Sequence, residues 1–268
     1  MAETNNTPTP GARWTLTGKR ALVTGGTKGI GLAIAEEMLT LGARVTVVGR
    51  TVERLREQLD DWTGRGLAAY GCPADVTTRE GRADTIRCAV TDMGGLDILV
   101  NNVGTNIRKL SLDYDEAEYA RVLDTNLGSA WEMCRAAHPY LAAQGGSIVN
   151  IGSVAGSTFV GSGAPYALSK AAMDEMTRYL AVEWAGDNIR VNGVNPWYTR
   201  TPLAAPVLSD PARVARILAR TPLGRLTEPE DVAALTAFLC LPSAAYITGQ
   251  SIAVDGGFLA YGFRASES

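Results

Sequence analysis

The chain has 268 residues, of which 46% are hydrophobic and 20% charged, enough apolar material for one large α/β domain. The net charge of −3 argues against a nucleic-acid-binding or anionic-membrane-binding protein. A single histidine, His138, excludes a metal site built on several histidines, and four widely spaced cysteines are typical of reduced thiols in a cytosolic protein. We therefore expect a cytoplasmic protein without a resident metal.

Short apolar strands alternate with helical segments along the whole chain. In chain order, the pattern predicts a strand at 20–26, a helix at 29–42, a strand at 43–50, a helix at about 51–62, a strand within 66–76, a helix capped by Thr77, a strand at 96–102, a helix at about 114–143, a strand at 146–153, a helix at 165–185, a strand at 188–196, a helix at about 228–240 and a strand at 251–257. The strands are nearly continuous Val/Ile/Leu runs, as in strands covered on both faces. This alternation predicts a doubly wound Rossmann fold, a seven-stranded parallel sheet with helices on both faces.

No composition break separates a second domain. We expect a flexible tail at 1–13, one Rossmann-type domain at 14–258 and a second tail at 259–268. Residues 197–226 form one large insertion, whose mixture of proline, apolar and basic residues suits a lid over a ligand cleft.

The sequence TGGTKGIG (24–31) joins the first strand to the first helix. Its glycines permit a tight turn and close approach of the backbone, and the helix N-terminus points free N–H groups toward a phosphate. The spacing is G-x-x-x-G-x-G rather than G-x-G-x-x-G, so the prediction of a dinucleotide site depends on the position after the first strand.

The end of the second strand distinguishes two cofactors. An acid there would bind the ribose hydroxyls of NAD, whereas a cation would pair with the 2′-phosphate of NADP. Gly49 stands at the acid's place, Arg50 follows it, and Lys28 adds a second positive charge. These residues predict NADP(H); the alternative is that both cations are ordinary exposed side chains.

Four further blocks complete a recognisable set: NNVG (101–104), Asn126, Ser153 and YALSK (166–170). With them, the chain resembles the short-chain dehydrogenase/reductase family over about residues 14–258, because the blocks occur in that family's order and approximate spacing.

Finer features are similar to the tropinone reductase branch of that family. They are Trp14 before the first strand, NNVGTNIRK (101–109) and NPWYTRTPL (195–203). Trp197, within the last block, stands where most of the family carries glycine.

Tyr166 and Lys170 are four residues apart in a helical segment, so both project from one face. The chain carries no Asp, Glu, Lys or Arg between Arg135 and Lys170, and the next charge is Asp174. An ammonium on the order of 5 Å from a phenol, at an effective dielectric of about 20, favours the phenolate by roughly 3 kcal/mol. We therefore expect Lys170 to lower the pKa of Tyr166 by about two units, which suits proton donation to a carbonyl oxygen.

The resemblance implies roles for the catalytic residues Asn126, Ser153, Tyr166 and Lys170. Ser153 would hydrogen-bond the substrate oxygen and orient Tyr166, Asn126 would anchor a water that relays protons to Lys170, and Lys170 would also hold the nicotinamide ribose.

The resemblance also implies two sets of binding residues. The cofactor set is Gly25, Thr27, Lys28, Gly29, Ile30, Gly31, Arg50, Asp75, Val76, Asn102, Val103, Gly104, Tyr166, Lys170, Pro196, Trp197, Thr199 and Thr201. The expected substrate pocket is Ser153, Ile107, Phe159, Val160, Tyr166, Trp197, Leu203 and Leu208, whose apolar members could equally be ordinary core.

Together these features predict an NADPH-dependent reductase of a small ketone, cyclic or otherwise compact and mostly apolar. One alternative is an alcohol dehydrogenase or a 3-oxoacyl-type reductase, for which Arg213, Arg216 and Arg220 would supply a basic docking surface. Another is a non-catalytic NADP(H)-sensing protein, against which the intact Tyr/Lys pair argues. The resemblance further implies a homotetramer or homodimer, with a small molecule as substrate and neither nucleic acid nor membrane as partner.

Overall fold

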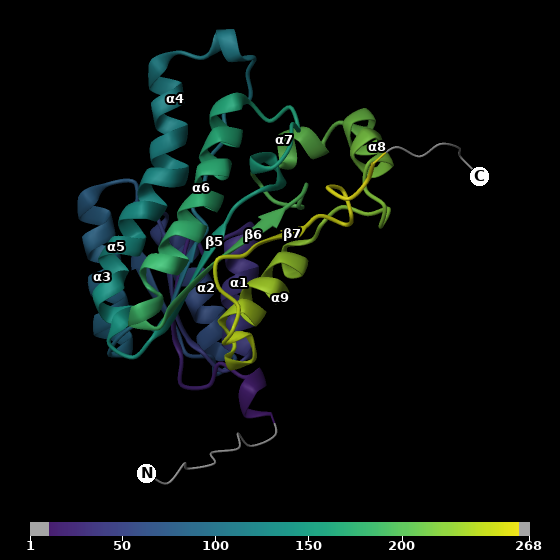
Figure 1. Cartoon of the computed structure of the whole chain (residues 1–268). Coiled ribbons are helices and arrows are strands. Elements are labelled where there is room, and N and C mark those ends of the chain that lie inside the picture. The colour runs from purple at the N-terminus through teal and green to yellow at the C-terminus, as the bar shows by residue number, and fades with distance from the viewer. Residues whose placement is uncertain (1–10, 263–268) are drawn as a thin grey trace.

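The computed structural model describes residues 11–262, and Figure 1 shows one sheet wrapped by helices. All neighbouring strands are parallel, in the order β3-β2-β1-β4-β5-β6-β7. The strands are β1 (Arg20–Thr24), β2 (Arg44–Gly49), β3 (Ala69–Pro73), β4 (Ile98–Asn101), β5 (Gly146–Ile151), β6 (Ile189–Pro196) and β7 (Ser251–Val254). The order reverses between β1 and β4, and open α/β sheets bind their ligands at such a switch point. The predicted doubly wound fold is confirmed.

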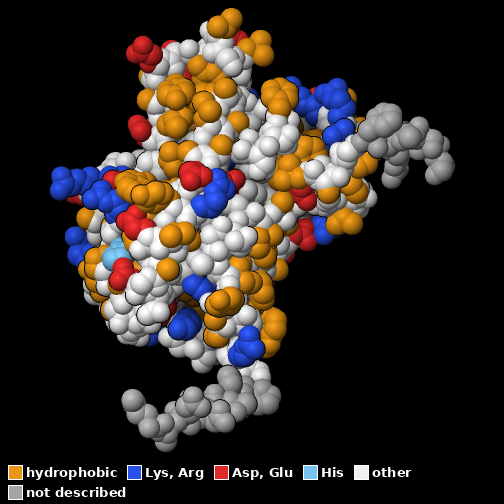
Figure 2. Space-filling view, viewed as in Figure 1, with side chains coloured by type: hydrophobic (Ala, Val, Ile, Leu, Met, Phe, Trp, Pro, Cys, Tyr) orange, Lys and Arg blue, Asp and Glu red, His pale blue; other side chains and the backbone are white. Residues whose placement is uncertain are grey.

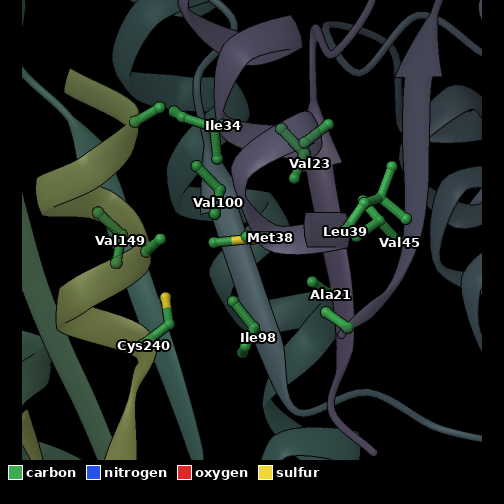
Figure 3. Close-up of a cluster of buried hydrophobic side chains, with 14 of the residues drawn as sticks. Ala21, Val23, Ile34, Met38, Leu39, Val45, Ile98, Val100, Val149 and Cys240 are labelled. Carbon is green, nitrogen blue, oxygen red and sulfur yellow. The ribbon is translucent and has the colours of Figure 1, made fainter. Parts of the chain in front are cut away.

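Helices cover both faces of the sheet. One hydrophobic cluster packs α1 (Gly29–Thr40), α2 (Val52–Gly64) and α9 (Pro229–Cys240) against one face. In Figure 3, Ile34 and Met38 of α1 lie against strand residues of this cluster. A second cluster packs α3 (Arg79–Met93), α5 (Ser129–Ala142) and α6 (Ala164–Glu183) against the opposite face. Successive strand residues point to opposite faces, which is why continuous apolar runs are needed.

The predicted helix at about 114–143 is interrupted. It consists of α4 (Glu116–Leu123) and α5, joined by a π-helical turn at Asp124–Gly128 that contains the buried Asn126. Such turns shift the backbone hydrogen bonds by one residue and frequently occur at functional sites.

The expected cap of α3 was wrong by one residue. Thr78, not Thr77, is the N-cap, and its hydroxyl accepts a hydrogen bond from the Gly81 N–H at 3.0 Å. Thr77 instead donates from its N–H and its hydroxyl to the Asp75 carboxylate, at 3.0 and 2.7 Å. Thr77 is thereby part of the loop that follows β3.

The insertion after β6 contains two short helices, α7 (Ala205–Leu208) and α8 (Pro211–Ala219). Their buried residues form a small cluster of their own with Trp197 and Tyr198, at the carboxyl end of β6. Figure 1 shows this region standing beside the carboxyl ends of the strands.

The two expected tails are described only in part. Residues 1–10 and 263–268 lie outside the described residues. Ala12–Trp14 form a short 3-10 helix, and the Trp14 ring stacks on Phe238 of α9 with centroids 6.1 Å apart. Within 11–262, every helix is too short or too polar to span a bilayer.

Candidate active site

A cleft of about 630 Å³ lies at the carboxyl edge of the sheet. It is lined by the loops that follow β1, β2, β3, β4, β5 and β6, and by the first turns of α6. Of the eighteen residues expected to bind a cofactor, all except Gly31 line it. The sequence blocks that lie far apart in the chain therefore meet at one site.

The glycine turn after β1 has the shape of a phosphate cradle. Gly25 and Gly29 have φ angles of 67° and 55°, in the left-handed region that favours glycine. Gly31 lies behind the cleft, where a Cβ would be 2.3 Å from the Gly25 carbonyl oxygen. The Asn102 amide donates to the carbonyl oxygens of Thr24 and Gly25 at 3.0 and 3.2 Å, and so holds the turn from the β4 side. The start of α1 thus presents backbone N–H groups to the cleft, an arrangement that fits a pyrophosphate.

The carboxyl end of β2 is closed to an acidic side chain. A Cβ at Gly49 would lie 2.6 Å from Thr27 Cγ2, so an Asp or Glu there would displace Thr27. Lys28, Arg50 and Arg54 line the cleft at this end. Sequence reasoning missed Arg54, although its position four residues after Arg50, at the start of a helix, indicated that both could face one ligand.

Asp75 is the acid that pairs with Arg50. Arg50 Nη1 lies 3.7 Å from Asp75 Oδ2, and the Arg50 side chain is 77% exposed. Partial burial opposes ionisation of Asp75, but the hydrogen bonds from Thr77 and the charge of Arg50 hold its pKa below the usual value. The Arg50 guanidinium therefore remains largely available to an incoming anion.

Ser153, Tyr166 and Lys170 meet at the other end of the cleft. Ser153 follows β5, and its hydroxyl accepts a hydrogen bond from the Ala155 N–H at 3.1 Å. Tyr166 and Lys170 lie on the first turns of α6, with Lys170 Nζ 5.8 Å from the centre of the Tyr166 ring. The predicted placement of the phenol and the ammonium on one face is confirmed.

The expected direction of the Tyr166 pKa shift is wrong. Burial raises the pKa of Tyr166 above its usual value and outweighs both the hydrogen bond with Ser153 and the positive charge of Arg108, which lower it. The expectation counted the attraction of Lys170 for the phenolate and neglected the free energy of burying that phenolate. At neutral pH the phenol is protonated, which is the state that a proton donor needs.

Lys170 is itself perturbed by burial. Its side chain is 4% exposed, and Nζ donates a hydrogen bond to the Ile151 carbonyl oxygen at 2.7 Å. Burial lowers the pKa of Lys170 from 10.5 to about 8, although the nearby Asp174 carboxylate raises it. This amine can exchange a proton close to neutral pH.

The depressed pKa of Lys170 predicts a pH-dependent stability. Below about pH 8 the Lys170 amine is protonated in both the folded and the unfolded chain, and burying its charge destabilises the fold. As pH rises from about 8 toward 10.5, the folded chain loses this proton while the unfolded chain keeps it, so the destabilisation disappears. We expect the free energy of unfolding to gain roughly 3 kcal/mol from this group across that window. Urea titrations of the parent and of Lys170→Met at both ends of the window measure it. Identical pH dependence in the two proteins would show that Lys170 is not the cause.

The comparisons with known proteins agree with this geometry. A family model described as enoyl-(acyl carrier protein) reductase matches residues 25–259. A tropinone reductase homolog of Arabidopsis thaliana is 50% identical over 253 residues, covering 94% of this chain and 96% of the relative. A solved short-chain type dehydrogenase/reductase from Mycobacterium marinum is 34% identical, with a TM-score of 0.86, and the match covers 91% of this chain and 97% of that one. The chain is a short-chain dehydrogenase/reductase.

A further solved relative carries ligands. The gluconate 5-dehydrogenase from Burkholderia cenocepacia, in complex with NADP and tartrate, is 29% identical with a TM-score of 0.90, covering 94% of this chain and all of that one. As a short-chain dehydrogenase/reductase, the protein is an oxidoreductase that acts on CH–OH or C=O groups, and related structures contain a nicotinamide cofactor.

In this short-chain dehydrogenase/reductase, Asn126 is buried and does not line the cleft. Its Oδ1 accepts from the Thr105 N–H at 2.7 Å, and its Nδ2 donates to the Thr105 carbonyl oxygen and to Ser169 Oγ, both at 3.0 Å. Ser169 in turn donates to the Tyr166 carbonyl oxygen at 2.7 Å. The Asn126 side chain therefore ties the loop after β4 to the helix that carries Tyr166 and Lys170.

Five of the eight residues expected around a substrate line the cleft. Val160, Trp197 and Leu203 line it together with Ser153 and Tyr166. Their apolar side chains add hydrophobic surface to the lining that also contains the phenol.

Three expected pocket residues do not line the cleft. The Phe159 side chain is 92% exposed, because it lies in the turn before α6 and points into solvent. Leu208 packs into the small cluster of the insertion, behind Trp197. Ile107 is held through its carbonyl oxygen, which accepts a hydrogen bond from the Tyr114 hydroxyl, and its side chain is absent from the lining.

Trp197 is a fixed wall of the cleft. Its ring stacks on Phe258 with centroids 3.7 Å apart and planes 9° apart, and its indole N–H donates to Thr221 Oγ1 at 3.1 Å. Tyr198 packs edge-on against it at 4.7 Å and also lines the cleft. The sequence did not indicate that Tyr198 lines the cleft. It also did not indicate the stacking of Phe258 on Trp197, because a contact between segments far apart in the chain leaves no local pattern.

Sequence reasoning also missed lining residues of the loop after β4. Arg108 stands in the block NNVGTNIRK, which was interpreted only through its resemblance to relatives. The structure places it on the cleft with Tyr166. The other polar lining residues that were not expected are Thr51, Thr77, Thr105, Asn106, Arg121, Thr125 and Ser162.

Proposed function

We propose that the chain is an NADPH-dependent reductase of small ketones. The observation that carries this proposal is that Ser153, Tyr166 and Lys170 lie in the same cleft as a phosphate-binding turn and a cluster of cations at the end of β2. One end of the cleft is suited to a phosphorylated dinucleotide, and the other to proton transfer.

The cofactor preference rests on charge and space at β2. At Gly49, the acid that would bind ribose hydroxyls would have to displace the Thr27 side chain, and Lys28, Arg50 and Arg54 offer positive charge to a 2′-phosphate. Related solved structures contain NADP in one case and NADH in another, so the proposed preference rests on the residues of this chain. Bound there, the reduced nicotinamide supplies the hydride that the carbonyl carbon accepts.

The residues of this chain supply the proton and the orientation. Tyr166 is protonated at neutral pH and would give its proton to the carbonyl oxygen. Ser153, which lines the cleft with Tyr166 and lowers the pKa of the phenol, would hold the same carbonyl oxygen. Lys170, with a pKa of about 8, would return a proton to the site, and Asn126 would keep both residues in position through the loop after β4.

An acyl-carrier substrate is less well supported. Arg213 forms an ion pair with Asp210 at 3.3 Å, and the Arg220 guanidinium lies 5.1 Å from the Tyr261 ring. Two of the three arginines that could form a basic docking surface therefore already have partners, which favours a small free substrate.

We further propose that the enzyme is a cytoplasmic homotetramer. Large hydrophobic side chains remain exposed on the helices α4, α5 and α6, and Figure 2 shows hydrophobic surface over α4 and α6. These side chains are Tyr119, Trp131, Tyr140, Leu168, Tyr179 and Val182. Contiguous exposed apolar surface of this kind marks interfaces between proteins.

The proposed function is tested by following oxidation of NADPH and of NADH with a panel of cyclic ketones. We expect turnover with NADPH and a kcat/KM for NADPH at least about tenfold above that for NADH, because one charged contact to the 2′-phosphate is sufficient for that ratio. The reverse reaction, reduction of NADP⁺ by the matching cyclic alcohols, is the control. Failure of both directions with every compound, or a preference for NADH, would contradict the proposal.

A further inference from the structure

We propose that Arg108 binds a carboxylate, so that the enzyme selects anionic ketones over neutral and cationic ones. This inference rests on the proposed function of the same cleft and names the chemical class of its substrate.

Arg108 lies at the reacting end of the cleft. It belongs to the loop between β4 and α4 and lines the cleft together with Tyr166 and Ser153. The charge of Arg108 favours the ionised form of the Tyr166 phenol, although burial raises the pKa of that phenol overall. A substrate whose carbonyl oxygen is near Tyr166 therefore also experiences the charge of Arg108.

The loop that carries Arg108 is held in place on both sides. Thr105, three residues before it, is fixed at its N–H and its carbonyl oxygen by the buried Asn126. Tyr114 donates from its hydroxyl to the Ile107 carbonyl oxygen and accepts from the Lys109 N–H at 3.3 Å. The backbone on either side of Arg108 is thus anchored, and a binding group on an anchored backbone loses less conformational entropy on binding.

The same loop is seated against the segment that leads into α6. A Cβ at Gly163, three residues before Tyr166, would lie 2.9 Å from the Ile107 carbonyl oxygen, and it would also collide with the Tyr114 hydroxyl. Gly163 has a φ angle of 99°, so its position depends on having no side chain. This close approach brings the loop with Arg108 next to the helix that presents the phenol.

Within residues 11–262, no acidic side chain pairs with Arg108. It makes no hydrogen bond or ion pair with any residue in the described range 11–262, whereas its neighbour Lys109 binds both carboxylate oxygens of Glu118 at 2.5 and 2.7 Å. Among the described residues that line the cleft, the one acid is Asp75, which follows β3 and pairs with Arg50 at 3.7 Å. The Arg108 guanidinium is thus left for a ligand.

The chemistry of this guanidinium defines the ligand. Its planar fork matches a carboxylate and can bind it through two parallel hydrogen bonds. Val160, Trp197 and Leu203 of the same lining supply apolar surface for the carbon skeleton of such a ketone. An ammonium-bearing ketone would meet a like charge and no carboxylate at this end of the cleft, so we expect it to be a poor substrate.

A matched pair of ketones tests the inference. The first is cyclohexanone with a carboxylate opposite the carbonyl, and the second is its methyl ester, which has the same ring and no charge. With NADPH, we expect the parent to prefer the carboxylate, and Arg108→Gln to lower kcat/KM for the carboxylate on the order of 30-fold, with little change for the ester. Lys109→Gln, which alters the adjacent cation away from the cleft, should behave as the parent with both compounds.

The outcomes separate this inference from the proposed function. Turnover of both ketones without preference for the carboxylate, or an equal loss for both in Arg108→Gln, would overturn the role of Arg108 and leave the reductase intact. If Arg108→Gln raises only the KM for NADPH, the carboxylate-binding role is also overturned, because Arg108 would then bind the cofactor. If neither ketone is reduced, calorimetric titration of the protein–NADP⁺ complex with cyclohexanecarboxylate decides: binding that Arg108→Gln abolishes supports the inference, and no binding to the parent contradicts it.

Discussion

Replacing Tyr166 with phenylalanine should lower kcat for ketone reduction about 1000-fold while leaving the affinity for NADPH nearly unchanged. The substitution removes one oxygen, the atom that would carry the transferred proton, and retains the ring next to Lys170. Stopped-flow measurement of NADPH oxidation gives kcat, and quenching of tryptophan fluorescence gives the affinity for NADPH.

Tyr179→Phe is the matched control for this experiment. Tyr179 lies on the same helix, α6, and its side chain is 65% exposed, away from the cleft. It should therefore react at the parental rate. If Tyr166→Phe retains the parental kcat with a ketone that the parent reduces, the phenol is not the proton donor.

The raised pKa of Tyr166 adds a pH signature to the same experiment. The phenol stays protonated through neutral pH, so reduction should be level there, whereas oxidation of the alcohol needs the deprotonated phenol and should accelerate as pH rises. Ketone reduction thus needs a protonated Tyr166 oxygen, and alcohol oxidation needs the same oxygen deprotonated. A rate of oxidation that falls with rising pH would contradict this assignment.

Replacing Arg50 with alanine should reduce kcat/KM for NADPH by about 10- to 100-fold and change that for NADH less than about threefold. The guanidinium is mostly exposed, and its one ion pair, with Asp75, is long at 3.7 Å, so it can bind a phosphate without a large loss of existing contacts. Removing a charged partner of the 2′-phosphate affects only the cofactor that carries this group. Initial rates with each cofactor at a fixed ketone concentration measure the ratio.

Arg56→Ala provides the comparison for Arg50→Ala. Arg56 is an exposed arginine of α2 that does not line the cleft, so its removal changes the net charge equally and the site not at all. An equal effect of both substitutions would indicate a general electrostatic attraction of NADPH rather than a contact. A parent that prefers NADH, with Arg50→Ala unchanged, would remove the argument for NADP altogether.

Much of the fold follows from local patterns. Apolar runs bounded by glycines predicted the strands, and their alternation with helices predicted a parallel sheet, because parallel strands need long crossovers. Tyr166 and Lys170 could be placed together for the same reason: a separation of four residues on a helix is a local distance. The glycine turn also follows from local sequence, since Gly25 and Gly29 adopt backbone angles that other residues avoid.

Contacts between distant segments left no such pattern. The π-helical turn at Asp124–Gly128 contains Asn126, whose amide is held by Thr105 and by Ser169. Helical periodicity alone predicted an uninterrupted helix there. Phe159 was placed in the pocket although it points into solvent, because the direction of a side chain in a turn depends on what packs beneath it.

The amino-acid sequence by itself determined which chemical groups this short-chain dehydrogenase/reductase brings to its cleft and on which elements they stand. Only the tertiary structure decided how deeply each group is buried and which charges face it. Burial and facing charge set protonation: they keep the Tyr166 phenol protonated and lower the pKa of Lys170 to about 8. The tertiary structure also places Arg108 in a cleft whose one acidic residue, among those described, is Asp75. The burial of a side chain and the charge that faces it depend on the surrounding atoms, and those atoms belong to segments far apart along the chain.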